Sequence, residues 1–286
     1  MIVIGDDYKP LFAREQSVAD FLAIDGEEYR NVAGVRRTLR FVRDGQAMFI
    51  KAHWGVGWRE ILKNLLYLRM PVLGARNEWQ AIQTLEGLGV PTMKLVAYGE
   101  QGIHPARRKS FVITEELGQT QQLDHWLAAN LYKYEPHQRV RIKWAIIDQL
   151  ADIARRLHNH GLNHRDFYIC HFLVDLKLAD KQHLPENLRM YLIDLHRVQH
   201  RRQIPMRWRI KDLAGLLYSA WYDTQGWQIT RTDVLRFIKT YCQCSPRSAI
   251  NEHAVLWRRV VARVSDTYYR DNGRKPRLDS FYTREK

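Results

Sequence analysis

A short run of chemically active side chains, Asn163-His164-Arg165-Asp166, follows a long helical pattern that ends at Gly161 and precedes the apolar run Phe172-Leu173-Val174. This places a carboxylate on a loop that regular elements hold at both ends, where catalytic groups are common. Asp166 can accept a proton from an attacking hydroxyl group. Because His-Arg-Asp also occurs by chance, a surface loop with an arginine–aspartate pair is the alternative at this point.

A second carboxylate, Asp194, ends an apolar, strand-like run, Tyr191-Leu192-Ile193-Asp194-Leu195. A carboxylate is a hard oxygen donor of the kind that Mg²⁺ prefers. We therefore interpret Asp194 as a candidate magnesium ligand, with a solvated aspartate at a strand end as the alternative.

An oppositely charged pair is predicted nearer the N-terminus. Glu78 shares one face of the helical pattern Asn77–Leu88 with Ile82 and Leu85. A carboxylate on an apolar face is costly unless a cation meets it. Lys51, at the end of a strand-like run, is the candidate cation, because a hairpin followed by a helix can bring strand and helix together. The alternative is that Glu78 lies at the edge of the apolar face and reaches water.

The elements that must position these groups change in type near residue 118. About five strand signals and one clear helix, residues 77–88, precede it; the strand-like runs include Tyr29–Phe41, Ala47–Ala52, Met93–Gly99 and Ser110–Glu115. Helical patterns and two short strand-like runs follow: Val140–His160, His171–Leu176, Met190–Leu195, Lys211–Tyr222, Thr232–Tyr241 and Glu252–Tyr269. This distribution predicts an α+β fold with two lobes, residues 1–118 and 119–286, and a cleft between them.

The order of the candidate groups resembles that of protein kinases. A strand lysine (Lys51), a helix glutamate (Glu78), a hinge-like Thr114-Glu115-Glu116-Leu117, the His-Arg-Asp loop and a strand-end aspartate (Asp194) follow one another on elements of the expected type. A chance match of all five is far rarer than a match of any one. The layout indicates a protein-kinase-like bilobal fold, with a small sheet-rich N-terminal lobe and a larger helical C-terminal lobe.

Longer segments narrow the resemblance. From about residue 30 to about residue 250, the sequence is similar to the bacterial lipopolysaccharide core heptose(I) kinases. Five segments carry this similarity: Arg36–Arg40, Lys63–Leu66, Arg69–Ala75, Asn163–Leu173 and Ile193–Arg197. The run Tyr168-Ile169-Cys170-His171 is the most specific part, because other kinases lack it. The resemblance implies ATP-dependent phosphorylation of the first heptose of the lipopolysaccharide inner core.

The resemblance also implies roles for the charged candidates. Asp166 would be the catalytic base that accepts the proton of the sugar hydroxyl. Lys51, fixed by Glu78, would hold the α- and β-phosphates of ATP. Asp194 would bind the Mg²⁺ ion that bridges the phosphates.

Two further roles are implied for the backbone and for a helix. The backbone of Glu115, Glu116 and Leu117 would meet the adenine edge. Asp212 resembles the helix aspartate that anchors the catalytic loop in kinase folds, and an ordinary acidic residue at a helix N-terminus is the alternative.

His171 departs from the protein-kinase pattern. It occupies the position five residues after Asp166 where protein kinases place an asparagine that binds a second metal ion. Imidazole is a softer donor than Mg²⁺ prefers. Three roles therefore stay open for His171: a weak metal ligand, a ligand that favours Mn²⁺, or a hydrogen-bonding partner of Asp166 or phosphate.

The segment expected to cover the phosphates, Asn31–Arg37, is also unusual because it has one glycine where protein kinases have three. The charge of Arg36 or Arg37 is a candidate replacement, and a solvated strand face is the alternative. A polar insertion, Leu178–Arg189, precedes Asp194 and leaves little room for a long activation segment.

The composition bears on the choice of partner. Among the 286 residues, 45 lysines and arginines against 31 aspartates and glutamates give a net charge of +14. Such a surplus favours anionic lipid, phosphorylated sugar, nucleic acid or an acidic protein, and the resemblance adds acyl carrier protein as a family-level possibility.

Three rival functions stay open beside the heptose kinase. The first is a kinase of the same fold that acts on a different core sugar or on a protein hydroxyl. The second is an inactive pseudokinase. The third, from a different class, is a basic nucleic-acid-binding module, but its recognition motifs are missing.

The sequence also predicts where the protein works. Three cysteines cannot form a disulfide framework, and no stretch has the roughly 18–20 apolar residues that span a bilayer. We therefore expect a cytoplasmic protein, peripheral at the cytoplasmic face of the inner membrane.

Two clusters have competing interpretations. Apolar residues between Trp54 and Leu68 are interspersed with Arg59 and Lys63. Packing between strand and helix is favoured for them, and contact with an anionic membrane is the alternative. The run His200–Arg209, rich in arginine and tryptophan, suits an acidic acceptor; a basic exposed loop is the alternative.

Overall fold

The structure, a computed structural model, describes residues 1–32, 35–66, 73–177, 188–224 and 228–276. The chain divides into two compact units. The first comprises Met1–Leu117 together with the short segment Asp194–Val198, and the second comprises Gly118–Ile193 and Gln199–Lys286. The segment that begins with Asp194 therefore belongs with the N-terminal residues, although its neighbours in the chain belong to the second unit.

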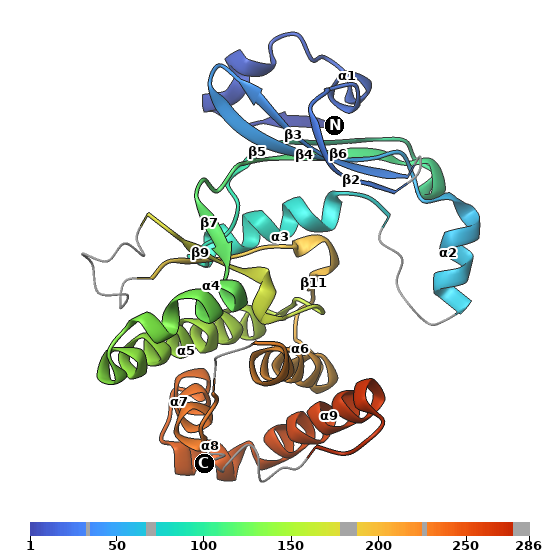
Figure 1. The fold of residues 1–286 in the computed structure, drawn as a ribbon. Coiled ribbons are helices and arrows are strands. Elements are labelled where there is room, and N and C mark those ends of the chain that lie inside the picture. Colours follow the sequence, from blue (N-terminus) through green and yellow to red (C-terminus); the bar gives the residue numbers. More distant parts are fainter. Residues whose placement is uncertain (33–34, 67–72, 178–187, 225–227, 277–286) are drawn as a thin grey trace. The chain divides into compact units, whose positions relative to one another are not determined.

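An antiparallel sheet forms the centre of the first unit (Figure 1). Its strands, in the spatial order β1-β5-β6-β4-β3-β2, are β1 (Ile2–Ile4), β2 (Glu27–Val32), β3 (Arg36–Arg43), β4 (Gln46–His53), β5 (Leu95–Gln101) and β6 (Lys109–Glu115). Asp44 and Gly45 join β3 to β4 with φ of 46° and 77°. Positive φ at both central residues is what a two-residue hairpin turn requires, as the Asp-Gly pair predicts.

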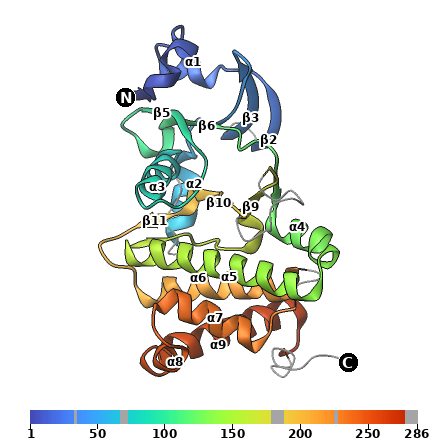
Figure 2. The same ribbon diagram turned by 90° about the vertical axis from the view of Figure 1, so that its left-hand side faces the viewer.

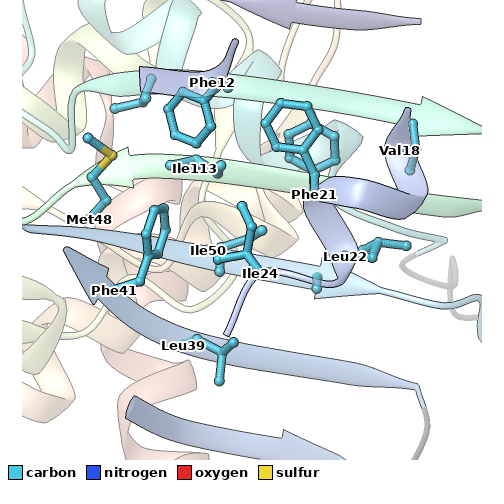
Figure 3. Packing of buried hydrophobic residues seen from close by; sticks show 14 of the residues in the cluster. Phe12, Val18, Phe21, Leu22, Ile24, Leu39, Phe41, Met48, Ile50 and Ile113 are labelled. Atoms are coloured by element: carbon cyan, nitrogen blue, oxygen red, sulfur yellow. The ribbon is translucent and has the colours of Figure 1, made fainter. Parts of the chain in front are cut away.

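One face of this sheet carries an aromatic core (Figure 3). The turn η1 (Asp6–Phe12) and the short helix α1 (Val18–Leu22) contribute buried side chains to it. Phe21 of α1 stacks on Phe111 of β6 with ring centroids 4.2 Å apart, and Ile50 and Ile113 are buried beside them. Burying one side chain of this kind stabilises the fold by about 1.5–3 kcal/mol.

The helix α3 (Arg76–Gly87) carries the predicted apolar face. Trp79, Ile82 and Leu85 are buried, and the helix contacts β5 and β6. The position of Glu78 is thereby fixed, because it lies in the first turn of the same helix.

A second helix, α2 (Gly57–Leu66), presents apolar side chains outward. Trp54 packs against the aromatic core and Ile61 is buried. Four other apolar residues are between 49% and 84% exposed: Trp58, Leu62, Leu65 and Leu66. They recur at i, i+4, i+7 and i+8 and so share one helix face. The favoured expectation of core packing is wrong for these four, and Leu68 lies outside the described residues.

The first unit also has more elements than the sequence predicted. The described part holds three α-helices where one was expected, and β1 was not expected. Because α1 has five residues, it is too short for a periodic signal. Its start is instead marked by a capping box, in which Ser17 accepts from the Asp20 amide and Asp20 accepts from the Ser17 amide.

Helices dominate the second unit (Figure 2). They are α4 (Leu123–Asn130), α5 (Pro136–Asn159), α6 (Met206–Tyr218), α7 (Arg231–Cys242), α8 (Pro246–Glu252) and α9 (Ala254–Asn272). Figure 2 shows α5 beside α7 and α6 beside α9, in agreement with their contacts. The helix α6 begins at Met206 rather than at the predicted Lys211. Pro205 immediately precedes it, and proline is tolerated at the start of a helix.

Short strands in the second unit hold the loops between the helices. They form two small antiparallel sheets, in the orders β10-β9-β7 and β11-β8. Their bounds are β7 (Thr120–Gln122), β8 (Leu162–Asn163), β9 (Phe172–Asp175), β10 (Met190–Leu192) and β11 (Gln199–His200). None of the helices in the described ranges is long and apolar enough to cross a membrane.

Candidate active site

The strand lysine and the helix glutamate meet in the first unit. Lys51 of β4 is paired with Thr38 on β3 and with Val112 on β6, so its backbone is fixed from both sides. Lys51 Nζ lies 2.5 Å from Glu78 Oε1, with the glutamate side chain 1% exposed and the lysine side chain 29% exposed. A buried carboxylate needs such a partner. The pair presents a positioned ammonium group that is partly open to an anion such as phosphate.

The carboxylates of Glu115 and Glu116, at the end of β6, are already engaged in hydrogen bonds within the protein. Arg40 donates two hydrogen bonds of 2.8 Å to the Glu116 carboxylate, and this lowers the pKa of Glu116. Tyr8 donates its hydroxyl hydrogen bond to Glu115. The amides of Glu115 and Glu116 also donate within the unit, to the carbonyl oxygens of Lys94 and Ala47 at 3.0 Å. The predicted backbone contact with adenine therefore has the carbonyl groups of this segment and the Leu117 amide as its candidates.

Asp194 precedes a short 3-10 turn, η6 (Leu195–Arg197), which contacts α3 within the same unit. Its backbone has a φ of 60°, a conformation that residues other than glycine seldom adopt and that is found at functional sites. His196 Nδ1 lies 2.5 Å from Asp194 Oδ1, and the carboxylate is 35% exposed. A hard oxygen donor that a neighbouring imidazole orients fits what a Mg²⁺ ion requires.

A buried carboxylate fastens the loop of Asp166 from within the second unit. Asp212 is fully buried and accepts hydrogen bonds from the amides of His164, at 2.7 Å, and Arg165, at 2.8 Å. Arg165 has a φ of 74°, a strain of about 1–3 kcal/mol that needs such support. Asp212 lies in the interior of α6 rather than in its first turn. Its position therefore agrees with the anchoring role and not with the helix N-terminal alternative.

His171 contacts the catalytic loop through the backbone. Its Nδ1 lies 2.6 Å from the carbonyl oxygen of Asp166. Because a carbonyl oxygen only accepts hydrogen bonds, Nδ1 carries a proton, and in the neutral form of the ring Nε2 then has the lone pair. Of the three roles left open for His171, a hydrogen bond to Asp166 is thus present, and Nε2 is the atom that could ligate a metal ion.

A lysine that the sequence analysis missed lies beside Asp166. Lys211 Nζ is 3.7 Å from Asp166 Oδ1, and the two side chains are 22% and 15% exposed. A cation here can stabilise negative charge that develops on a transferred phosphoryl group. The chain offered no more than an indirect signal, because Lys211 directly precedes Asp212 but adjacent helix residues do not share a face.

The predicted site residues divide between the two units. The first holds Lys51, Glu78, Asp194 and residues 115–117, and the second holds Asp166 and His171. The structure brings Lys51 to Glu78, and His171 to the backbone of Asp166. That all of them act on one nucleotide stays a prediction. Within the described residues, no group of three His, Cys, Asp or Glu side chains is arranged to hold a metal ion.

Arg37 has a structural role. It donates to the carbonyl oxygen of Ile24 at 2.9 Å and stacks on Trp54 with 5.7 Å from Cζ to the ring centroid. It thereby ties β3 to the segment after α1, which makes it a poor candidate for phosphate contact. Residues 33–34 of the loop, 69–72 of the resembling segments and 178–187 of the polar insertion lie outside the described residues.

Comparison with known proteins decides the family. Residues 20–241 match the lipopolysaccharide kinase (Kdo/WaaP) family. Two relatives named lipopolysaccharide core heptose(I) kinase WaaP, from Pseudomonas aeruginosa and Escherichia coli K12, are each 41% identical to this chain. The first alignment covers 94% of this chain and 96% of the relative, and the second covers 84% and 87%. The chain belongs to the lipopolysaccharide kinase (Kdo/WaaP) family.

A solved structure described as WaaP in complex with acyl carrier protein matches as well. It is 37% identical, superposes with a TM-score of 0.75, and the match covers 94% of this chain and 99% of that one. The family and the α+β structure confirm the predicted fold class and the predicted kinase family. The chain is therefore a phosphotransferase of the kinase class.

Proposed function

We propose that this family member is an ATP-dependent kinase that phosphorylates the first heptose of the lipopolysaccharide inner core. One observation carries the proposal. Asp166 lies on a loop that Asp212 anchors, with Lys211 at 3.7 Å, in a chain 41% identical to a heptose(I) kinase over 94% of its length.

The residues of the first unit serve nucleotide binding in this proposal. Lys51, fixed by Glu78, contacts the phosphates, and the backbone at the end of β6 contacts the adenine edge. Asp194 is the candidate metal ligand of this unit, and Nε2 of His171 is a separate candidate ligand in the second unit. ATP with Mg²⁺, when bound, supplies the phosphoryl group and a metal ion that neutralises phosphate charge.

The residues of the second unit serve the acceptor sugar. Asp166 accepts the proton of the attacking hydroxyl group and aligns that hydroxyl. Lys211 stabilises the negative charge on the phosphoryl group during transfer. Asp212 keeps the loop backbone in place throughout, since it accepts hydrogen bonds from two loop amides, and buried His158 lies beside it with Nε2 3.5 Å from Oδ2.

The test is mass spectrometry of core oligosaccharide after incubation with the protein and ATP. A heptose-containing oligosaccharide should gain one phosphate, and a Kdo-only oligosaccharide should gain none. Asp166→Asn should abolish the gain but leave ATP affinity and the free energy of unfolding nearly unchanged. Undiminished turnover in that variant would end the assignment. Transfer to a different core sugar or to a protein hydroxyl would instead favour a related kinase of the same fold.

We further propose that the exposed face of α2 contacts an anionic membrane surface, where a lipid-linked acceptor is presented. Trp58, Leu62, Leu65 and Leu66 form the apolar face, and Arg59 and Lys63 are exposed on the same helix. An amphipathic helix with aromatic, aliphatic and basic residues binds at the interface between headgroups and acyl chains. The net charge of +14 complements anionic lipid.

Vesicle sedimentation tests this contact. The double variant Trp58→Ser/Leu62→Ser should bind vesicles that contain phosphatidylglycerol at least fivefold more weakly than the unaltered protein. Ile103→Gln is the matched control, because Ile103 is an apolar residue of the same unit, 90% exposed, outside α2. Equal losses in both variants, or self-association through α2 in place of lipid binding, would contradict the proposal.

An acyl carrier protein is the proposed protein partner, which the complex described for the related structure supports. The second unit contains an apolar cavity of about 110 Å³ between α5, α6, α7 and α9, and Leu213, Leu216 and Val260 are among its lining residues. An apolar lining of this kind suits an acyl chain. Co-purification with acylated but not with unacylated carrier protein is expected. The Leu216→Asp variant, altered in the cavity wall, should lose it, provided that circular dichroism shows the fold intact.

A further inference from the structure

Three guanidinium groups surround one indole ring in the second unit. The Cζ atoms of Arg165, Arg201 and Arg207 lie 5.3, 5.5 and 5.4 Å from the centroid of the Trp208 ring. Each gains from the ring's quadrupole, but three cations gathered at one ring also repel one another. In the described part of the chain, no carboxylate forms an ion pair with Arg201 or Arg207. Burial lowers the pKa of Arg201, and the charge of Arg207 lowers it further.

The cluster is held rigidly from the backbone outward. The Arg201 guanidinium donates hydrogen bonds of 2.5 Å to Asn163 and Gln199. Its amide donates to the carbonyl oxygen of Gly161 at 2.9 Å. Gly161 has a φ of 76°, and a Cβ there would lie 1.8 Å from the Arg201 carbonyl oxygen, so only glycine fits. The Arg201 guanidinium is therefore positioned before any ligand arrives.

The cluster lies close to the proposed base. Arg165 immediately precedes Asp166 in the chain. Arg207 and Lys211 are four residues apart on α6 and so share a helix face, with about 5–6 Å between Cβ atoms. Lys211 Nζ is itself 3.7 Å from Asp166 Oδ1. A row of cations, Lys211, Arg207 and Arg165, thus lies between Asp166 and the tryptophan.

We propose that Arg165, Arg201 and Arg207 around Trp208 bind an oxyanion, a carboxylate or a phosphate, on the acceptor saccharide whose hydroxyl group reacts at Asp166. The proposal rests on the proposed function and names a subsite of it. A guanidinium binds either oxyanion through two parallel hydrogen bonds. The indole Nε1 of Trp208 is buried and has no acceptor among the described residues, so it is a further donor that a ligand can satisfy.

The experiment compares Arg207→Gln with the control Arg202→Gln. Arg202 is exposed and adjacent to Arg201, but within the described residues it makes no cation–π contact with Trp208. The dissociation constant for heptose-containing core oligosaccharide is measured by calorimetry without ATP, and KM for the same oligosaccharide by phosphate transfer. Both should rise about tenfold in Arg207→Gln, the loss of one charge-assisted hydrogen bond. KM for ATP should not change, and the control should stay within twofold on every measure.

Two altered acceptors identify the anion. Carboxyl-reduced oligosaccharide and dephosphorylated oligosaccharide are each compared with the intact compound. The unaltered protein should bind one of them about tenfold more weakly, and Arg207→Gln should bind that compound and the intact one equally. If the unaltered protein phosphorylates the oligosaccharide but Arg207→Gln matches it on all three acceptors, the subsite is refuted and the proposed function stands. A protein that neither binds nor phosphorylates the intact oligosaccharide overturns both.

Discussion

Replacement of the buried loop anchor, Asp212→Asn, has an effect that can be worked out from its contacts. The carboxylate accepts amide hydrogen bonds of 2.7 Å from His164 and 2.8 Å from Arg165, whereas asparagine has one accepting oxygen for these two donors. Two charge-assisted bonds contribute about 3–6 kcal/mol, and the remaining neutral bond contributes about 1 kcal/mol. Because removal of a buried charge also returns part of its desolvation cost, a loss near the lower limit, about 2 kcal/mol, is expected.

The same variant should lose activity beyond its loss of stability. Without both bonds, the strained backbone of Arg165 can relax from its φ of 74°, and the next residue is Asp166. A displacement of about 1 Å at a reacting group can cost about a hundredfold in rate. The free energy of unfolding is measured by urea titration, and turnover by phosphate transfer under conditions in which the variant is fully folded.

Asp148→Asn is the matched control for Asp212→Asn. Asp148 bonds Arg236 at 2.5 Å and Thr240 at 2.8 Å, joins α5 to α7, and is 34% exposed. It should lose about 1 kcal/mol of stability with normal turnover. The anchoring argument fails if Asp212→Asn has the same free energy of unfolding and the same turnover as the unaltered protein. It also fails if the control variant loses as much turnover as Asp212→Asn.

Three more perturbations follow from contacts in the site. Glu78→Gln removes the charged partner of Lys51, so KM for ATP should rise about tenfold in steady-state assays; an unchanged KM contradicts the pairing role. Lys211→Met should lower kcat about a hundredfold with KM for ATP unchanged, and a normal kcat would dismiss its role. His53 is buried, which lowers its pKa to about 3. Between pH 6.5 and 3 the unfolded chain binds a proton that the folded chain does not. The free energy of unfolding should therefore decrease as the pH is lowered through this range, by up to about 1.4 kcal/mol per pH unit. His53→Gln should flatten this slope in urea titrations.

Local sequence patterns were enough to predict those elements whose physical cause lies in neighbouring residues. The Asp44-Gly45 turn has the positive φ values that this pair favours. The long helix was expected over Val140–His160 and spans Pro136–Asn159, because its apolar residues repeat at helical spacing. Glu78 could be recognised as unusual from the same spacing, since a charge on an apolar face needs a partner.

What escaped prediction depends on contacts between distant residues. Lys211 and Asp166 are 45 positions apart in the chain, and only the anchoring of the loop by α6 brings them together. The arginines around Trp208 come from the loop after β8, from the segment after β11 and from α6, so no local pattern shows that they share one ring. The apolar face of α2 has the spacing of a core helix, and periodicity cannot tell whether protein or another surface covers it.

The same substitution, aspartate to asparagine, distinguishes the role of Asp194 from that of Asp212. Asp194→Asn removes the same charge as Asp212→Asn, but the Asp194 carboxylate is 35% exposed, whereas that of Asp212 is fully buried. Asparagine also tolerates the left-handed conformation of residue 194, which has a φ of 60°. The free energy of unfolding should therefore change by less than about 1 kcal/mol, whereas activity should be lost and excess Mn²⁺ or Mg²⁺ should restore part of it. A metal ligand on a strained turn contributes to function rather than to stability, whereas a buried anchor contributes to both. A large loss of stability in Asp194→Asn, without any dependence of activity on the metal concentration, would therefore reject Asp194 as a metal ligand.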